Sequence, residues 1–85
     1  MSNIKDYKPG FISSFANKIE KDNLSKAVAT QILSENQQRM EEVRYRLKEG
    51  ARDQNYMNSS QYIKDLHEVQ ERSKLTAALI KKLSK

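Results

Sequence analysis

Basic side chains gather near the C-terminal end of the chain, where they could bind phosphate groups. Residues 59–85 carry six basic and three acidic side chains, and no acid follows Glu71. Clustered Lys and Arg attract nucleic acid or another polyanion, but no Phe, Tyr or Trp follows Glu71 to stack on bases. Cations in the last turns of a helix also complement its dipole, and we favour this structural role. The possible anion-binding residues are Arg72, Lys74, Lys81, Lys82 and Lys85.

Patterns typical of catalysis or metal binding are weak. His67 is the only histidine and there is no cysteine, so the residues for a thiolate or multi-histidine metal site are missing. Neighbouring carboxylates such as Glu41 and Glu42 lie in mixed-charge stretches, where ion pairing explains them better than acid-base chemistry. The two glycines are too far apart for a phosphate-binding loop. We therefore expect a protein that is not an enzyme and holds no cofactor or metal.

Length and composition indicate one small folded domain. Hydrophobic residues make up 36% of the 85 residues and recur periodically, which favours folded helices over disorder. No apolar stretch is long enough to span a membrane, and the first ten residues lack the apolar core of a secretory signal. Together with the absence of cysteine, these features predict a cytoplasmic protein.

Two long helices are predicted from residues that recur at alternating spacings of three and four. The first covers about 24–49, with Asn23 as its N-cap and Gly50 in a left-handed turn at its end. The second covers about 60–83. The stripe of the first helix is Ala29, Leu33, Asn36, Met40, Val43 and Leu47. The stripe of the second is Tyr62, Leu66, Val69, Ser73, Thr76, Ile80 and Leu83.

These two stripes pair if the chain folds back at the linker 51–58. Leu47 then faces Tyr62, and a polar layer forms in the middle of the seam, the line of contact between the two helices. Asn36 could satisfy its amide across this layer, or could turn to solvent. A capping box beginning at Ser34 also leaves open a break in the first helix. The predicted polar layer is Asn36, Ser73 and Thr76.

The N-terminal part is predicted to add one short helix. Residues 1–10 form a flexible or extended lead that ends at the turn-forming pair Pro9 and Gly10. A short amphipathic helix follows over about 11–21. The predicted fold is therefore all-α, an antiparallel helical hairpin with a short additional N-terminal helix, with 11–85 as one helical domain. The apolar face of the short helix is Phe11, Phe15 and Ile19, flanked by Ile12 and Ala16.

Apolar residues outside the seam gather at the open end of the hairpin, away from the linker. Such a surface must be covered by the chain itself or by a partner. The short N-terminal helix could fold over it, or the helices of another protein or of a second copy could occupy it. The residues predicted to bind a partner are Leu24, Val28, Ile32, Leu75, Leu79, Phe11 and Phe15.

One further set of residues is informative as a pattern: Leu47 followed by Gly50-Ala51 in the link, Gln61-Tyr62 at the start of the second helix, the stripe through Leu66 and Val69, and the run Ala77-Ala78-Leu79-Ile80. With these residues the chain resembles, between about Val28 and Leu83, the small two-helix co-chaperones of type III secretion needles. The link between the helices is longer here, the chain is more basic, and it has an added N-terminal segment. The resemblance implies a hairpin that docks on a helical-repeat chaperone, the two together holding the needle subunit unpolymerised in the cytoplasm.

Three functional hypotheses follow. The first is a protein-binding hairpin that acts as a chaperone, an adaptor or a small subunit of an assembly. The second is a basic nucleic-acid-binding module, and the third is a structural homodimer formed by self-association. The hypotheses differ in partner: another helical protein, nucleic acid, or a second copy of the chain.

Overall fold

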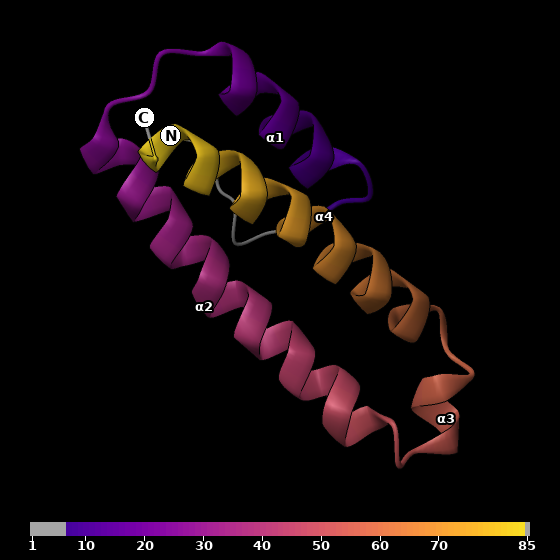
Figure 1. The fold of residues 1–85 in the computed structure, drawn as a ribbon. Helices are drawn as coiled ribbons and strands as arrows, with labels where there is room; N and C mark the ends of the chain where they lie inside the picture. The colour runs from indigo at the N-terminus through magenta and orange to yellow at the C-terminus, as the bar shows by residue number, and fades with distance from the viewer. Residues whose placement is uncertain (1–6, 85) are drawn as a thin grey trace.

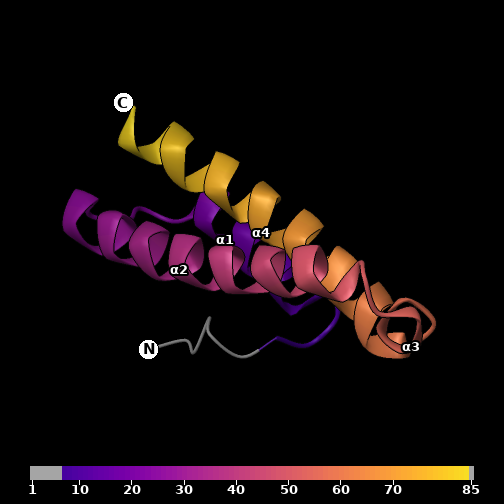
Figure 2. The same cartoon turned by 90° about the horizontal axis from the view of Figure 1, so that it is seen from below.

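The computed structural model describes residues 7–84, and these form four helices (Figure 1). The elements follow one another as α1 (Phe11–Lys21), α2 (Lys26–Gly50), α3 (Gln54–Met57) and α4 (Ser60–Leu83). The long helices α2 and α4 are the arms of an antiparallel hairpin with α3 at its tip, and α4 packs against both α2 and α1. In the view of Figure 2, α2 and α4 diverge away from the α3 end. The predicted all-α hairpin with an additional N-terminal helix is confirmed.

The helix α1 begins and ends where the sequence predicted, but a different face is buried. Gly10 precedes it with a φ of 85°, a left-handed conformation that favours glycine. Its buried residues Ile12, Ala16 and Ile19 recur at spacings of four and three, whereas Phe11 is 38% exposed and Phe15 is half-buried. The buried face is therefore centred one residue beyond the predicted line of phenylalanines.

The lead before α1 is partly built into the fold. Residues 1–6 of the predicted flexible lead lie outside the described residues. Tyr7 is buried at 9% exposure and belongs to the apolar core, so the end of the lead is packed rather than free.

The helix α2 starts at Lys26, two residues later than predicted. Ser25 rather than Asn23 is the N-cap, because its Oγ accepts a hydrogen bond from the backbone N–H of Val28 at 3.2 Å. The helix then continues without a break through Ser34 to its end, over roughly 38 Å. Its buried residues keep the predicted spacing of three and four, and they are Ala29, Ile32, Asn36, Met40 and Val43.

The linker folds more tightly than predicted. Residues 54–57 form α3, where Asp53 accepts a hydrogen bond from the N–H of Asn55 at 3.0 Å. Gly50 is the last residue of α2 and is not in the predicted left-handed conformation. Its role is steric, because a Cβ at this position would lie 2.2 Å from Cδ2 of Tyr56. The Tyr56 ring also meets Tyr62 edge to face at 5.7 Å between centroids, which closes the tip.

The helix α4 has the predicted bounds, but the predicted buried face is wrong. Leu66 is 37% exposed, Ile80 is 49% exposed and Ser73 is exposed. The observed face lies one residue earlier, a rotation of about 100° around the helix axis. It forms because α4 packs between two helices and because its charged residues find partners inside. The buried residues are Asp65, Glu68, Arg72, Leu75, Ala78 and Leu79.

The apolar core lies at the open end of the hairpin, where α1 covers α4. The short helix therefore folds over the apolar surplus, which is one of the two possibilities that the sequence left open. The buried core residues are Tyr7, Ile12, Ala16, Ile19, Ala29, Ile32, Leu75, Ala78 and Leu79. The half-buried residues packed against them are Phe15, Leu24, Leu33 and Leu83.

The close approach at Gly50 gives a first prediction. Gly50→Ala should lower the free energy of unfolding by about 1–3 kcal/mol, because the added methyl group displaces the Tyr56 ring. In a Tyr56→Ala background the same change should be neutral or stabilising, since alanine favours helix over glycine. Urea unfolding followed by circular dichroism measures both effects. Equal destabilisation in the two backgrounds would show that contact with Tyr56 is not the cause.

Candidate protein-binding surface

A buried ion-pair network joins α4 to α2. The Glu68 carboxylate is 2.8 Å from Nε of Arg72, one turn further along α4, and 2.9 Å from Nε of Arg39 on α2. Arg72 and Glu68 are buried at 0% and 1% exposure. Burying charges costs free energy unless they are paired and hydrogen-bonded. The network therefore requires that this side of α4 face Arg39.

Asn36 extends this network across the centre of the hairpin. Its Nδ2 donates to the carbonyl of Arg72 at 3.1 Å and to Oγ1 of Thr76 at 2.9 Å. Its Oδ1 accepts from Nη1 of Arg72 at 3.0 Å. Of the three residues in the expected polar layer, the structure thus joins Asn36 to Thr76 and leaves Ser73 on the surface. Arg72 takes the place of Ser73, because the rotation of α4 turns Ser73 outward.

A second buried carboxylate holds the hairpin tip. Asp65 accepts hydrogen bonds from Arg46 Nη2 at 2.8 Å, from the Tyr56 hydroxyl at 2.6 Å and from Gln61 Nε2 at 2.8 Å. Burial alone would raise the pKa of Asp65, but these bonds outweigh it and lower the pKa. Burial and the bond to Asp65 raise the pKa of Tyr56 to about 12. Asp65 is therefore a structural anion that ties the linker and both arms together.

A third carboxylate holds the start of α1. Glu71 accepts hydrogen bonds from the backbone N–H groups of Gly10 at 3.1 Å and Ser13 at 2.9 Å, and from the Tyr7 hydroxyl. Since α1 has no side-chain cap of its own, Glu71 supplies both a hydrogen-bond acceptor and a negative charge at the positive helix end. Burial alone would raise the pKa of Glu71, but these hydrogen bonds outweigh it and hold that pKa below 4.5.

The residues predicted to bind a partner are mostly inside the protein. The open end of the hairpin is not a free surface, because α1 covers it. Buried residues of the set are Ile32, Leu75 and Leu79. Half-buried residues are Leu24 and Phe15. Exposed residues are Val28 at 43% and Phe11 at 38%.

The predicted anion-binding residues do not form one patch. Arg72 is buried against Glu68, and half-buried Lys82 donates to the backbone carbonyl of Asp22 at 3.0 Å. Lys82 thereby holds the end of α1 as Glu71 holds its start. Lys85 lies outside the described residues. The exposed members are Lys74 and Lys81.

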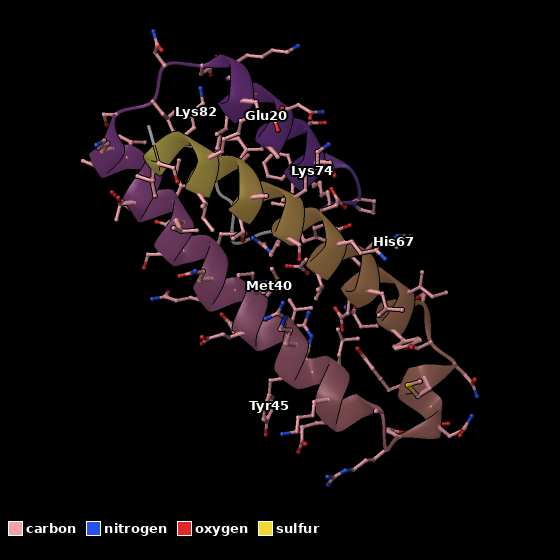
Figure 3. The ribbon with its side chains drawn as sticks, viewed as in Figure 1. Glu20, Met40, Tyr45, His67, Lys74 and Lys82 are labelled. Carbon is pink, nitrogen blue, oxygen red and sulfur yellow. The ribbon has the colours of Figure 1, made fainter. Side chains whose placement is uncertain are left out.

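The lone histidine lies on the surface of α4. His67 is exposed and points away from the helices (Figure 3). Within residues 7–84 no group of three or more His, Asp or Glu side chains is placed to hold a metal ion. In the same part of the chain every buried side-chain nitrogen and oxygen has a hydrogen-bond partner. The buried titratable groups therefore hold the fold together.

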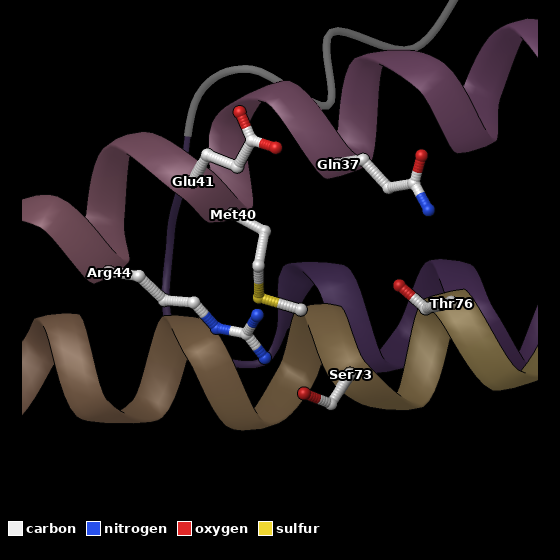
Figure 4. Close-up of a pocket in the computed structure, with 6 residues that line it drawn as sticks. All are labelled: Gln37, Met40, Glu41, Arg44, Ser73 and Thr76. Atoms are coloured by element: carbon white, nitrogen blue, oxygen red, sulfur yellow. The ribbon is translucent and has the colours of Figure 1, made fainter.

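An open groove runs between α2 and α4 on the side away from α1 (Figure 4). Its volume is about 380 Å³, and Met40 extends into it from α2 towards α4. Leu66 and Ile80 stand one heptad before and after Ser73, so they extend the same side of α4 beyond the groove at both ends. The lining residues are Gln37, Met40, Glu41, Arg44, Ser73 and Thr76.

This groove was not expected from the sequence, because its α4 residues were assigned to the seam. The sequence nevertheless contains a pattern that indicates which side of α4 is buried. Asp65, Glu68 and Arg72 stand at spacings of three and four, in register with the apolar Leu75 and Leu79. On α4 this stripe of charged residues continues a stripe of apolar residues, and complementary charges lie opposite it on α2. Such a combined stripe indicates the buried face of a helix, just as a purely apolar stripe does.

The ion-pair network gives a second prediction. Glu68→Leu should lower the free energy of unfolding by about 3 kcal/mol or more, because it removes the carboxylate shared by Arg39 and Arg72. The double variant Glu68→Leu and Arg72→Met should recover part of this loss, because the buried charge is then removed while Asn36 Oδ1 loses the donor Nη1 of Arg72. Guanidinium unfolding measures both variants. A double variant no more stable than Glu68→Leu would contradict the explanation.

The Glu71 contacts give a third prediction, for pH. Because its pKa is lowered by folding, Glu71 stabilises the fold fully above 4.5, the pKa without these contacts, and this stabilisation disappears as the pH falls through the lower folded-state pKa. Glu71→Gln should therefore be less stable than the wild type at pH 7, with the difference shrinking at acid pH. Thermal unfolding between pH 7 and pH 3 measures it. A difference that stayed constant over this range would exclude the Glu71 charge as the cause.

Comparisons with known proteins add no relative. Within residues 7–84 no helix is both long and apolar enough to cross a lipid bilayer. No protein-family model, curated protein or solved structure matches the chain, so the proposals below rest on its own residues and contacts.

Proposed function

We propose that this protein is a non-enzymatic, cytoplasmic protein-binding module that acts as a chaperone, an adaptor or a small subunit of an assembly. The single observation that carries the proposal is the open groove with its two exposed apolar neighbours. Leu66 and Ile80 are 37% and 49% exposed on a helix whose other side is fully occupied. Leaving large apolar side chains in water costs roughly 25 cal/mol per Å², a cost that a bound protein removes.

The interior supports this choice of surface. The apolar end of the hairpin is covered by α1, and Glu71 and Lys82 fasten both ends of that helix. The face first expected to bind a partner is therefore used within the chain. The groove on the opposite side has no such cover from residues 7–84, and its floor includes the nearly buried Met40.

A specific form of the proposal is a co-chaperone of type III secretion needles. It rests on the resemblance in the linker and in α4, and it predicts a helical-repeat protein as the partner. Some of the residues that carry the resemblance have a structural role at the hairpin tip: Gly50 leaves space for the Tyr56 ring, Tyr62 packs on Tyr56, and Gln61 donates a hydrogen bond to Asp65. Identifying the captured partner decides between this form and other assemblies.

A fourth prediction tests the proposed function. Leu66→Asp combined with Ile80→Asp should abolish the capture of native partners while the helix content and melting temperature stay close to the wild type, because both side chains are already exposed. The measurement is affinity capture with quantitative mass spectrometry, on variants whose fold is checked by circular dichroism. Proteins retained by the wild type and lost by the double variant are the specific partners.

A matched control separates a specific surface from apolar stickiness. Tyr45 is 65% exposed on α2 and points away from the hairpin (Figure 3), so Tyr45→Asp makes a similar apolar-to-acid change elsewhere. This variant should capture the same partners as the wild type. If the double variant captured them equally well, or if only a second copy of the chain were recovered, the proposed function would be wrong. Light scattering over a dilution series detects the self-association.

A further inference from the structure

We propose that the open groove binds one amphipathic α-helix of a partner protein, and that acidic side chains flank the apolar stripe of that helix. The inference rests on the proposed function and names the class of its partner. It goes further because it assigns shape and charge to the bound segment.

The geometry favours a helix as the occupant. Two antiparallel helices leave a groove on each side of their line of contact, and here α1 covers one side at the open end of the hairpin. The other side exposes side chains of α2 and α4 and no strand edge to pair with an extended peptide. A helix in the open groove would complete a four-helix arrangement, in which an apolar stripe packs on the groove floor.

The floor and edges of the groove match such a stripe. Met40 is 7% exposed at the centre and Thr76 is half-buried, and the half-buried Leu33 and Val69 stand seven residues before them on the same sides of α2 and α4. Along the α4 side the exposed residues at spacings of three and four carry no charge. They are Ile63, Leu66, Gln70, Ser73, Ala77, Ile80 and Ser84. This edge can therefore contact apolar or small side chains of an incoming helix without burying an ion.

The charged α2 residues that line the groove are one acid, Glu41, and one cation, Arg44, and the same side of α2 carries further cations beyond both ends of the groove. Residues that share the side of Gln37 include three exposed cations and one exposed acid, Glu41. The other three acids of α2, Glu35, Glu42 and Glu49, recur every seven residues on another flank, which they share with Arg39 and Arg46. The cations on the groove side are Lys26, Arg44 and Lys48.

The excess of cations on the groove side of α2 favours some kinds of binding partner over others. A partner helix with acidic flanks would pair with the cations along α2, which favours both its orientation and its association rate. A second copy would bring two basic edges together, and like charges facing each other across an interface are unfavourable. The structure thus points to a different, acidic protein segment rather than to a homodimer through this groove.

The experiment is a selection from displayed helices on the intact chain. A library of 25-residue helices carries Leu, Ile or Met at the positions of one stripe, with random Asp, Glu, Lys, Arg, Gln and Ser at the flanks. Clones are selected on the wild type, and those that also bind the uncharged variant Leu66→Gln combined with Ile80→Gln are discarded, so that the counter-selection does not itself favour acidic flanks. Enriched helices should carry a clear excess of Asp and Glu at the flanks.

Synthetic peptides then measure the charge dependence. The best clone and a copy with every flanking acid changed to Lys should differ in Kd by at least about tenfold at low salt, with a smaller difference at high salt. Arg44→Glu should weaken the acidic peptide severalfold, while Lys64→Glu, a charge reversal at an exposed site on the side of α4 opposite Ser73, should leave its binding unchanged. Fluorescence anisotropy measures each of the two peptides on the wild type and on both variants.

Each outcome decides the inference. Enrichment of neutral or basic flanks, no helix specific for the groove, or equal effects of Arg44→Glu and Lys64→Glu would overturn it. If native capture through Leu66 and Ile80 succeeded while the selection failed, the acidic-helix inference would fall and the proposed function would stand. If capture were insensitive to Leu66 and Ile80, the proposed function would fail on its own test.

Discussion

The pairing of buried carboxylates on α4 with guanidinium groups on α2 is the constraint on which the rest of the structure depends. Glu68 and Asp65 are both buried, so each must face a cation, and Arg39 and Arg46 on α2 provide them. Both contacts lie on the same side of α4, and they are three residues apart along α4 and seven residues apart along α2. Once they form, the rotation of α4 around its own axis is set. Asn36 also stabilises this rotation of α4, because its hydrogen bonds to Arg72 and Thr76 form when α4 is turned this way.

That rotation decides which residues are left for a partner. Leu66 and Ile80 would be buried if the predicted apolar stripe of α4 faced α2. They are exposed because the charged stripe of α4 faces α2 instead. The same rotation presents Leu75, Ala78 and Leu79 to the core that α1 completes. The protein thus uses one apolar side of α4 for its own core and leaves the other beside the open groove.

The short helix α1 is part of this division of surfaces. Eleven residues are too few for a stable isolated helix, so its stability comes from contacts with α4. Burial of Ile12, Ala16 and Ile19 supplies the apolar part, and Glu71 supplies the acceptor that the helix start lacks. In return α1 covers the open end of the hairpin.

By itself, the sequence determined the all-α class, the hairpin, and the bounds of α1 and α4, because turn residues, caps and the 3.6-residue period are local signals. It also indicated a polar contact through Asn36. The N-cap at Ser25 and the start of α3 rest on local contacts that the sequence analysis did not select, whereas only the tertiary structure decided the rotation of α4 and the position of α1. The physical reason is that these depend on pairing between distant residues: Asp65 and Glu68 look like solvated charges along the chain and become interior groups only when Arg46 and Arg39 lie opposite them. The candidate binding surface depends on that pairing, since Leu66 and Ile80 are exposed as its consequence.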